Sequence, residues 1–390
     1  MQRRTTRIVN IGGVPLGGHH PIRVQSMTNL PTADIKGQVE QILKCADAGA
    51  EYMRITVPTL KDAAHFAEIK KRLKTTSSVN IPLIADIHFS PKVAIEVAKV
   101  ANKVRINPGN FIKSGVPDLI GNRESGVGTR DQRPGTNDQP FLSRLRDALL
   151  PLLIVCKDYG TAIRIGTNHG SLSERIMNLH GDTPEGMVVA TMEAIEVCRM
   201  ENFHNIVISL KSSNVRVMTQ ATRLFAEQID AKGWNYPIHL GVTEAGDGDD
   251  GRIKSAVGIG SLLVDGIGDT VRVSLTEDPE NEIPVAYNIL QAARSRITKT
   301  DYIACPGCGR TQFGLQETLQ KVRAATEHLT GLKIAVMGCI VNGIGEMADA
   351  DYGYVGAGAG KVNLYKGKEQ VRKNIPEKEA IEELLKLIDD

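Results

Sequence analysis

The 390-residue sequence has few aromatic residues and almost no net charge. Phe, Trp and Tyr together make up 4% of it, which argues against a role that depends on stacking nucleic-acid bases. Its 47 Lys and Arg residues nearly balance its 45 Asp and Glu residues, giving a formal charge of +2. A chain with so small a charge has no overall field that attracts nucleic acid or a membrane surface. We therefore expect neither as a partner.

Long apolar runs and a disulfide pattern are also missing. No stretch approaches the roughly 20 apolar residues of a membrane span, and no signal-peptide-like segment follows the basic start. Six cysteines in so long a chain do not suggest a disulfide scaffold. Cys45, Cys156 and Cys198 lie in apolar, periodic surroundings that are typical of buried free thiols. These features predict a cytoplasmic protein.

What the sequence does contain is a repeated unit of an apolar strand, a polar cluster and an amphipathic helix. The predicted strands with their polar ends lie at 22–28, 52–57, 83–88, 103–109, 162–168, 206–212, 238–244 and 270–275. Strands that alternate with helices imply a parallel sheet with right-handed crossovers. Eight such units favour a (β/α)8 TIM barrel over an open sheet. Residues 7–17, ahead of the first unit, are interpreted as a small hairpin that plugs the bottom of the barrel.

The repeated pattern is interrupted by one insertion and stops before the last quarter of the chain. Segment 114–137 is rich in Gly, Arg, Asp and Pro and is predicted to be a flexible insertion after the fourth strand, either a loop at the barrel mouth or a segment without catalytic role. After residue 298 the pattern changes. Residues 299–390 are predicted to form a smaller α/β domain, with helices at 315–329 and 377–388, strands at 333–338 and 361–365, and a glycine-rich stretch at 352–360. The fold class is therefore α/β, with two domains.

Positively charged residues recur where the predicted barrel strands end. The set comprises Arg54, Arg105, Arg164, Lys211 and Arg272. In TIM barrels the active site lies at the carboxyl ends of the strands, so these side chains should converge on one cup. Any one of them would be explained by an ion pair, but cations gathered together require an anion, and guanidinium groups suit phosphate oxygens. The pattern predicts a strongly anionic substrate such as a diphosphate.

Other polar residues at the strand ends can donate hydrogen bonds or transfer protons. They are Asp86, His88, Asn107, Asn168, Glu244 and Ser274, with His169 a weaker candidate. His88 is interpreted either as a donor to a phosphate oxygen or as a structural residue. Glu244 is a candidate proton donor or base, and a salt bridge to Arg272 or Lys211 is the alternative.

The second predicted domain carries three cysteines in two short motifs. Cys305-Pro306-Gly307-Cys308 is followed by Cys339 and then by Glu346. Soft thiolates favour iron–sulfur clusters, zinc or copper(I). A redox-active dithiol would leave Cys339 unexplained, whereas a zinc site would be completed by His328 or Glu346. A cubane cluster would use the three thiolates and leave its fourth iron to Glu346 or to a substrate oxygen.

Seven longer motifs carry a resemblance to a known family. They are Val24–Asn29, Ala85–Phe89, Arg105–Asn110, Leu240–Gly246, Gly266–Ser274, Cys305–Arg310 and Gly338–Gly343. They closely resemble those of the 4-hydroxy-3-methylbut-2-enyl diphosphate synthase family, and the similarity covers nearly the whole chain apart from the insertion. The family belongs to the methylerythritol phosphate route to isoprenoids. The resemblance implies a two-electron reductive ring opening and dehydroxylation of 2-C-methyl-D-erythritol 2,4-cyclodiphosphate.

The resemblance also implies roles for individual residues. One [4Fe-4S] cluster per chain would be held by Cys305, Cys308, Cys339 and Glu346. The cyclic diphosphate would be held by Arg54, Arg105, Arg164, Asn168, Lys211, Arg272 and Ser274, with Glu244 near the reacting carbons. His88 and Asn107 join this substrate-binding set from their positions at the strand ends.

Partners follow from the same resemblance. It implies a homodimer in which one subunit's cluster domain closes over the other subunit's barrel. Flavodoxin or ferredoxin would supply the electrons, since the sequence shows no nucleotide-binding fingerprint. The chain departs from the family at Ile344, where proline is usual, just before Glu346. The rival interpretation is a non-enzymatic sensor that binds a phosphorylated metabolite and docks a partner through its metal-bearing domain.

Overall fold

The computed structural model describes residues 2–111 and 139–390. The predicted insertion at 114–137 lies outside the described residues. The chain divides into two compact units, one ending at Ser295 and the other spanning Arg296–Asp390. Each unit has its own hydrophobic core.

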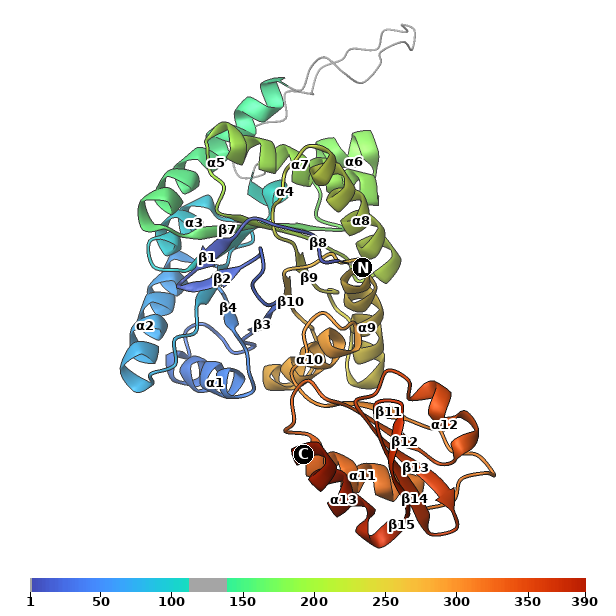
Figure 1. Ribbon diagram of the computed structural model, residues 1–390. Helices are drawn as coiled ribbons and strands as arrows, with labels where there is room; N and C mark the ends of the chain where they lie inside the picture. The colour runs from blue at the N-terminus through green and yellow to red at the C-terminus, as the bar shows by residue number, and fades with distance from the viewer. Residues whose placement is uncertain (1, 112–138) are drawn as a thin grey trace, which may run out of the picture. The chain divides into compact units, whose positions relative to one another are not determined.

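Eight parallel strands form the central sheet of the first unit (Figure 1). They are hydrogen-bonded in the order β8-β7-β6-β5-β4-β3-β10-β9, and a parallel bridge between Ile208 and Ile238 joins the two ends. Their bounds are β3 Arg23–Met27, β4 Tyr52–Thr56, β5 Leu83–Asp86, β6 Lys103–Ile106, β7 Ala162–Asn168, β8 Ile206–Lys211, β9 His239–Leu240 and β10 Thr270–Val271. The sheet is a nearly closed barrel, so the TIM-barrel prediction is confirmed.

Helices surround the strands in the first unit. They are α1 Ile35–Asp47, α2 Leu60–Thr76, α3 Pro91–Ala98, α4 Pro108–Phe111, α5 Gln139–Tyr159, α6 Glu174–His180, α7 Pro184–Met200, α8 Val215–Ala231, α9 Gly248–Val264 and α10 Glu282–Ala292, with a 3-10 turn at Pro279–Asn281. Several begin at a capping residue. The side chains of Thr59, Ser90 and Asn214, for example, accept hydrogen bonds from backbone N–H groups in the first turns of α2, α3 and α8.

The barrel strands place alternate side chains inside and outside the barrel. In β6, Val104 and Ile106 belong to the hydrophobic core that the helices share with the sheet. Lys103 and Arg105 therefore face the barrel interior. The same period of two brings Arg54, Asp86 and Arg164 inward from their strands.

A hairpin closes the amino-terminal end of the barrel. It consists of β1 (Val9–Ile11) and β2 (Val14–Leu16), paired antiparallel. Its apolar residues form a separate buried cluster with inward-facing residues from the starts of four barrel strands, comprising Val9, Ile11, Leu16, Tyr52, Ile84, Ala162 and Val207. The Tyr52 hydroxyl also donates to the carbonyl oxygen of Val14 at 2.9 Å. The predicted plug is confirmed.

The second unit contains a five-stranded sheet in the order β11-β12-β13-β14-β15. The strands are β11 Asp301–Ala304, β12 Lys333–Met337, β13 Tyr352–Gly358, β14 Lys361–Lys366 and β15 Glu369–Pro376. The first three are mutually parallel and the last two antiparallel to their neighbours. Helices α11 (Leu315–Thr326) and α13 (Glu377–Asp389) cover one face. The segment following the short helix α12 (Ile340–Glu346) packs on the other through Met347.

The glycine-rich stretch at 352–360 proves to be mostly strand β13. Two of its glycines lie where other parts of the chain come very close. A Cβ at Gly356 would come within 2.4 Å of the carbonyl oxygen of Gly338, and one at Gly353 within 2.9 Å of the Met347 sulfur. Gly358 and Gly360 instead take positive φ at the turn into β14.

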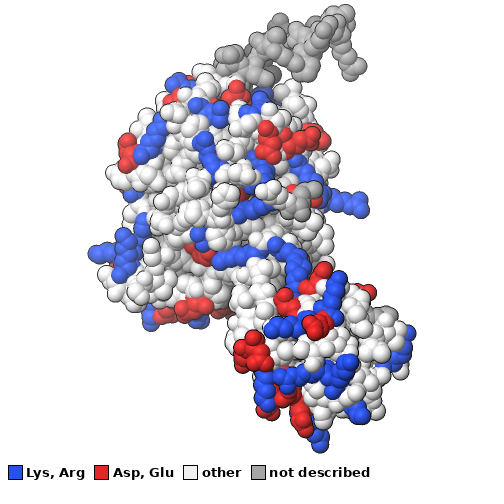
Figure 2. Space-filling view, in the orientation of Figure 1, with Lys and Arg blue, Asp and Glu red and all other residues white. Residues whose placement is uncertain are grey.

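The surface of the visible face carries charges of both signs, interspersed over each unit (Figure 2). Within the described ranges, no helix has the length and apolar character needed to cross a membrane.

Candidate active site

The inward-facing cations of the barrel form the densest charge cluster in the first unit. Arg54, Arg105, Arg164 and Lys211 are all buried, with exposed fractions of 8%, 3%, 1% and 4%. Arg105 is the register partner of Arg164 on the neighbouring strand, and Lys211 is the partner of Asn168, four residues further along β7. We call Arg54, Arg105, Arg164, Lys211 and Arg272 the cationic cup.

Asp86 is the buried carboxylate that holds two members of the cationic cup. Its oxygens lie 3.3 Å from Arg105 and 3.8 Å from Arg54. Burial by itself would raise the pKa of Asp86, but Arg54, Arg105 and Arg164 together lower it below the ordinary range of a carboxyl group. His88 lies 2.9 Å from Arg105, and burial together with this cation lowers the pKa of His88.

Arg164 is poorly compensated for a buried cation. Its Nη1 donates to Ser209 Oγ at 2.9 Å, whereas its Nε and Nη2 are buried and have no hydrogen-bond partner among the residues described. Burial, with Arg54 and Arg105 nearby, lowers the pKa of Arg164 well below its ordinary value. Two unused donors on a buried guanidinium group are a strong indication of an absent anionic ligand.

Lys211 and Arg272 complete the cationic cup from β8 and from the residue after β10. Burial, Arg164 and Arg54 lower the pKa of Lys211 well below its usual value. Arg272 lies 3.4 Å from Glu282 and lines a cavity of about 300 Å³ together with Thr28 and Thr56. This cavity lies at the carboxyl ends of β3, β4 and β10, where a TIM barrel places its ligands.

Two glycines leave room for the cations. A Cβ at Gly166 would come within 2.6 Å of Arg105 Nε, and a Cβ at Gly241 within 2.7 Å of Lys211 Nζ. Neither distance is compatible with a side chain unless a cation moves. Sequence reasoning missed both residues, although Gly166 lies two residues from the candidates Arg164 and Asn168 in β7, and Gly241 directly follows β9.

The remaining predicted residues divide into two groups. Asn107 and Asn168 each leave one buried amide atom without a partner in the described part of the chain, and Ser274 follows Arg272 on the half-buried segment after β10. Glu244 is exposed on the loop after β9, with a positive φ of 54°. No hydrogen bond or ion pair joins Glu244 to the cationic cup in the described ranges. The alternative of a salt bridge to Arg272 or Lys211 therefore finds no support.

The pH dependence of stability should reveal the role of Asp86. Because its pKa is lower in the folded than in the unfolded protein, its stabilising contribution is present above the unfolded value of about 4 and is lost as the pH falls below it. We expect urea unfolding, followed by the fluorescence of the single Trp234 in the barrel unit, to lose stability below about pH 4 more steeply in the wild type than in Asp86→Asn. Equal slopes would contradict this assignment.

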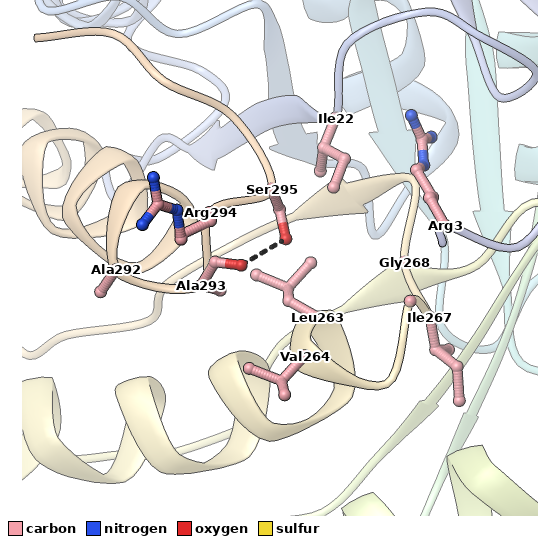
Figure 3. Close-up of a pocket in the computed structure, with 11 residues that line it drawn as sticks. Arg3, Ile22, Leu263, Val264, Ile267, Gly268, Ala292, Ala293, Arg294 and Ser295 are labelled. Atoms are coloured by element: carbon pink, nitrogen blue, oxygen red, sulfur yellow. Dashed lines mark hydrogen bonds between the residues drawn. The ribbon is translucent and has the colours of Figure 1, made fainter. Parts of the chain in front are cut away.

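Another cavity, of about 450 Å³, lies at the opposite end of the barrel (Figure 3). It is lined by the segment before β10, the residues after α10, Ile22 and Arg3. Arg3 is already paired with Asp269 at 2.7 Å, and Arg294 is the other charged residue of the lining. This composition does not match an anion site of the kind formed by the cationic cup.

The second unit gathers the predicted metal ligands around one cavity. Cys305, Cys308, Cys339 and Glu346 all line a space of about 210 Å³. Cys305 and Cys308 come from the loop after β11, Cys339 precedes α12, and Glu346 ends that helix. All six cysteines are free thiols, and the three in the barrel unit are buried.

The surroundings of the three thiols suit an iron–sulfur group. The Gly307 N–H donates to Cys305 Sγ at 3.4 Å, and hydrogen bonds from the backbone and side chain of Arg310 lower the pKa of the Cys308 thiol. Thiolates with amide donors directed at sulfur are the environment that proteins provide for such clusters. Within the described residues, His328 does not line this cavity. Among the residues that the structure describes, no three or more His, Cys, Asp or Glu side chains are arranged to hold a single metal ion.

Comparison with known families matches both units. The GcpE TIM-barrel domain matches residues 6–287, and the GcpE protein C-terminal domain matches residues 301–390. Two curated relatives, from Synechococcus sp. (strain CC9902) and Synechocystis sp. (strain ATCC 27184 / PCC 6803 / Kazusa), are each 52% identical to this chain, covering 100% of it and 94% of their own length. Both are named 4-hydroxy-3-methylbut-2-en-1-yl diphosphate synthase (ferredoxin).

Solved structures are more distant. A Yersinia pestis dihydropteroate synthase in complex with a sulfonamide drug is 10% identical, with a TM-score of 0.47, over 74% of this chain and 100% of its own. An N-acetylneuraminic acid synthetase from Leptospira borgpetersenii has a TM-score of 0.46 at 10% identity, over 83% of this chain and 98% of its own. Values this low do not inform on chemistry.

Proposed function

The chain belongs to the GcpE family, and we propose that it uses electrons from ferredoxin to convert 2-C-methyl-D-erythritol 2,4-cyclodiphosphate into 4-hydroxy-3-methylbut-2-en-1-yl diphosphate. It is an iron–sulfur oxidoreductase of isoprenoid biosynthesis, as are the relatives that share 52% of its residues along its full length. An enzyme, not a metabolite sensor, is thus the function to explain. The observation that best supports the substrate is the cationic cup, four of whose five cations are buried and in which Arg164 keeps two donors without partners among the described residues.

The cationic cup would bind the cyclic diphosphate. Arg164 offers two unused donors, Lys211 adds charge from the neighbouring strand β8, and Arg272 adds charge from the segment after β10. His88, Asn107, Asn168 and Ser274 would complete the set with neutral hydrogen bonds. Because these groups are fixed by the barrel before the ligand arrives, they stabilise the negative charge that develops when the C–O bond to phosphate breaks.

The cluster would be held by Cys305, Cys308, Cys339 and Glu346. We propose one [4Fe-4S] cluster per chain, since the three thiols and the carboxylate line one cavity. When bound, it would supply the electrons one at a time and a Lewis-acidic iron. Glu346 ends a short helix that carries Ile344, where the family resemblance leads us to expect proline, so we propose that the position of its carboxylate depends on that turn.

Glu244 is the proposed proton donor to the departing hydroxyl group. Its loop position after β9 leaves the carboxyl group exposed, at the strand ends where the substrate would lie. A Glu244→Gln variant should bind substrate with unchanged affinity but turn it over at least about 100-fold more slowly, which is the usual contribution of general acid catalysis. A fall in affinity with normal turnover would instead assign Glu244 to binding.

We also propose the partners and the location. A homodimer is expected, so light scattering should give the mass of two chains. Ferredoxin appears in the names of the relatives, and flavodoxin is the alternative donor, so turnover with each reduced protein should be compared. The six free thiols support a reducing, cytoplasmic environment.

One experiment tests the function as a whole. Protein purified without air should be brown, contain about four iron atoms per chain, and convert the cyclodiphosphate when reduced ferredoxin is supplied. Colourless protein with one zinc per chain, or brown protein that fails to consume the cyclodiphosphate, would refute the proposal.

The fit of Arg105 beside Gly166 gives a further test. In Gly166→Ala the added methyl group should displace Arg105 at a cost of about 1–3 kcal/mol, which weakens cyclodiphosphate binding by roughly fivefold to 150-fold. The control is Gly260→Ala on α9, where the nearest atom to a new Cβ would be Ile289 Cγ2 at 3.9 Å. Calorimetric titration should give the wild-type affinity for this control. Equal affinities in both variants would show that the gap at Gly166 does not matter.

A further inference from the structure

Below the cationic cup, the barrel interior holds buried polar groups that the proposed mechanism does not use. Lys103, His239, Gln25 and Thr270 are exposed by no more than 1%. Lys103 Nζ, both ring nitrogens of His239, both amide atoms of Gln25 and Thr270 Oγ1 have no hydrogen-bond partner within the described residues. Such groups are rare in folded proteins and call for an explanation.

Among these groups, the Lys103 amine has the highest free-energy cost of burial when it is charged. Its neighbours in the sheet are Ile84 and Ala162, which belong to the apolar cluster of the hairpin plug. The amine lies 5.1 Å from the ring centroid of Tyr52, and a cation over a ring gains only about 0.5–2 kcal/mol. That gain is smaller than the cost of burying an unpaired ammonium group.

The charged groups facing Lys103 are mostly cations. The plug, 9–16, has none. β3 contributes Arg23, which is paired with Glu51 at 2.6 Å. The other strands contribute Arg54, Asp86, Arg105, Arg164, Lys211, His239 and Arg272. Burial, Arg164 and Arg54 accordingly lower the pKa of Lys103 well below its ordinary value. Without a ligand, burial and these cations shift the amine toward its neutral form.

A bound diphosphate reverses this balance. Its negative charges offset Arg54 and Arg164, and in a low-dielectric interior they also attract a proton to any nearby base. We propose that Lys103 binds a proton from solvent when the cationic cup binds its diphosphate, so that anion and proton enter the barrel together. In this step the amine lone pair takes up the proton, the buffer gives it up, and no other bond changes.

The proton uptake suits the proposed reaction, on which this inference rests. Conversion of the cyclodiphosphate dianion to the product trianion and water consumes two electrons and one proton. Lys103 does not need to touch the substrate for this, since its effect is to store positive charge beneath it. Lys211, which lies in the cationic cup itself, can also gain a proton on binding. The contribution of Lys103 is therefore the number of protons taken up by the wild type minus the number taken up by a variant that lacks Lys103.

Calorimetry can count the protons. Oxidised holoenzyme without reductant is titrated with the cyclodiphosphate in buffers of different ionisation enthalpy near neutral pH. We expect about one proton fewer to be taken up by Lys103→Met than by the wild type. His239→Gln, which changes the other unpartnered titratable group, should match the wild type.

The outcomes distinguish failure of the proposed function from failure of the role proposed for Lys103. An absence of binding heat in the wild type would contradict the proposed function. Normal binding with equal proton counts in wild type and Lys103→Met, or a loss confined to His239→Gln, would overturn only the role of Lys103. Lys103→Leu is the second variant. Because an apolar side chain loses no hydrogen bond here, both variants should unfold at or above the wild-type temperature, and collapse of both would also overturn the inference.

Discussion

Arg164→Met should remove most of the affinity for the cyclodiphosphate while leaving the iron content unchanged. Arg164 is 1% exposed and has two donors without partners, so its interactions are made chiefly with the ligand. Loss of one partner from a buried, hydrogen-bonded charge pair costs about 2–5 kcal/mol. The dissociation constant should therefore rise roughly 30-fold to 3,000-fold, measured by calorimetric titration of oxidised holoenzyme.

The same variant should be at least as stable as the wild type without ligand. Replacing a poorly compensated buried cation by an apolar side chain of similar length is often neutral or stabilising. Arg223→Met is the matched control, because Arg223 lies on α8 and pairs with Asp265 at 2.7 Å on the outside of the barrel. Its affinity for the cyclodiphosphate should stay within about twofold of the wild type. An unchanged affinity in Arg164→Met would rule out the cationic cup as the diphosphate site.

Cys339→Ser should abolish both the brown colour and turnover. Cys339 is buried, precedes α12, and is the one thiol of the three outside the Cys305–Cys308 loop. With only two thiolates left, the cavity retains too few sulfur ligands for a cubane, so iron should fall from about four atoms per chain to near zero. The visible absorption spectrum and iron content of protein purified without air measure this directly.

A second cysteine provides the control for this experiment. Cys198 is a buried thiol of α7, and burial raises its pKa to about 12, so it is an inert group. Cys198→Ser should keep the wild-type iron content and activity, with at most a modest loss of stability from the buried hydroxyl group. Full iron content in Cys339→Ser would mean that a different residue ligates the cluster.

Periodicity in the sequence was sufficient to predict the barrel. Apolar strands with polar ends, separated by amphipathic helices, required a parallel sheet, and the plug followed from a short apolar hairpin ahead of them. The glycine-rich stretch that became β13 could not be read in this way. Gly356 is required by its contact with Gly338 on another element, and sequence periodicity does not reveal such a contact.

The candidate site was predictable where charged residues interrupt apolar strands. Arg54, Arg105 and Arg164 stood out as cations within such runs, although the structure places Arg54 and Arg164 inside β4 and β7 and not at the strand ends. Lys103 was overlooked because it begins its strand, yet its spacing of two from Arg105 placed it on the same inward face. The roles of these residues remain predictions, because ligand identity is not encoded in the packing of the chain.

The hairpin plug has a consequence for how the protein is made. Residues 9–16 are synthesised ahead of all eight barrel strands, but their buried partners extend to Val207, and Arg3 and Thr6 both bond to Asp269. These contacts span most of the barrel sequence, so they form only after nearly all of it has been synthesised. Until then the apolar side chains of the hairpin stay exposed to chaperones and to aggregation.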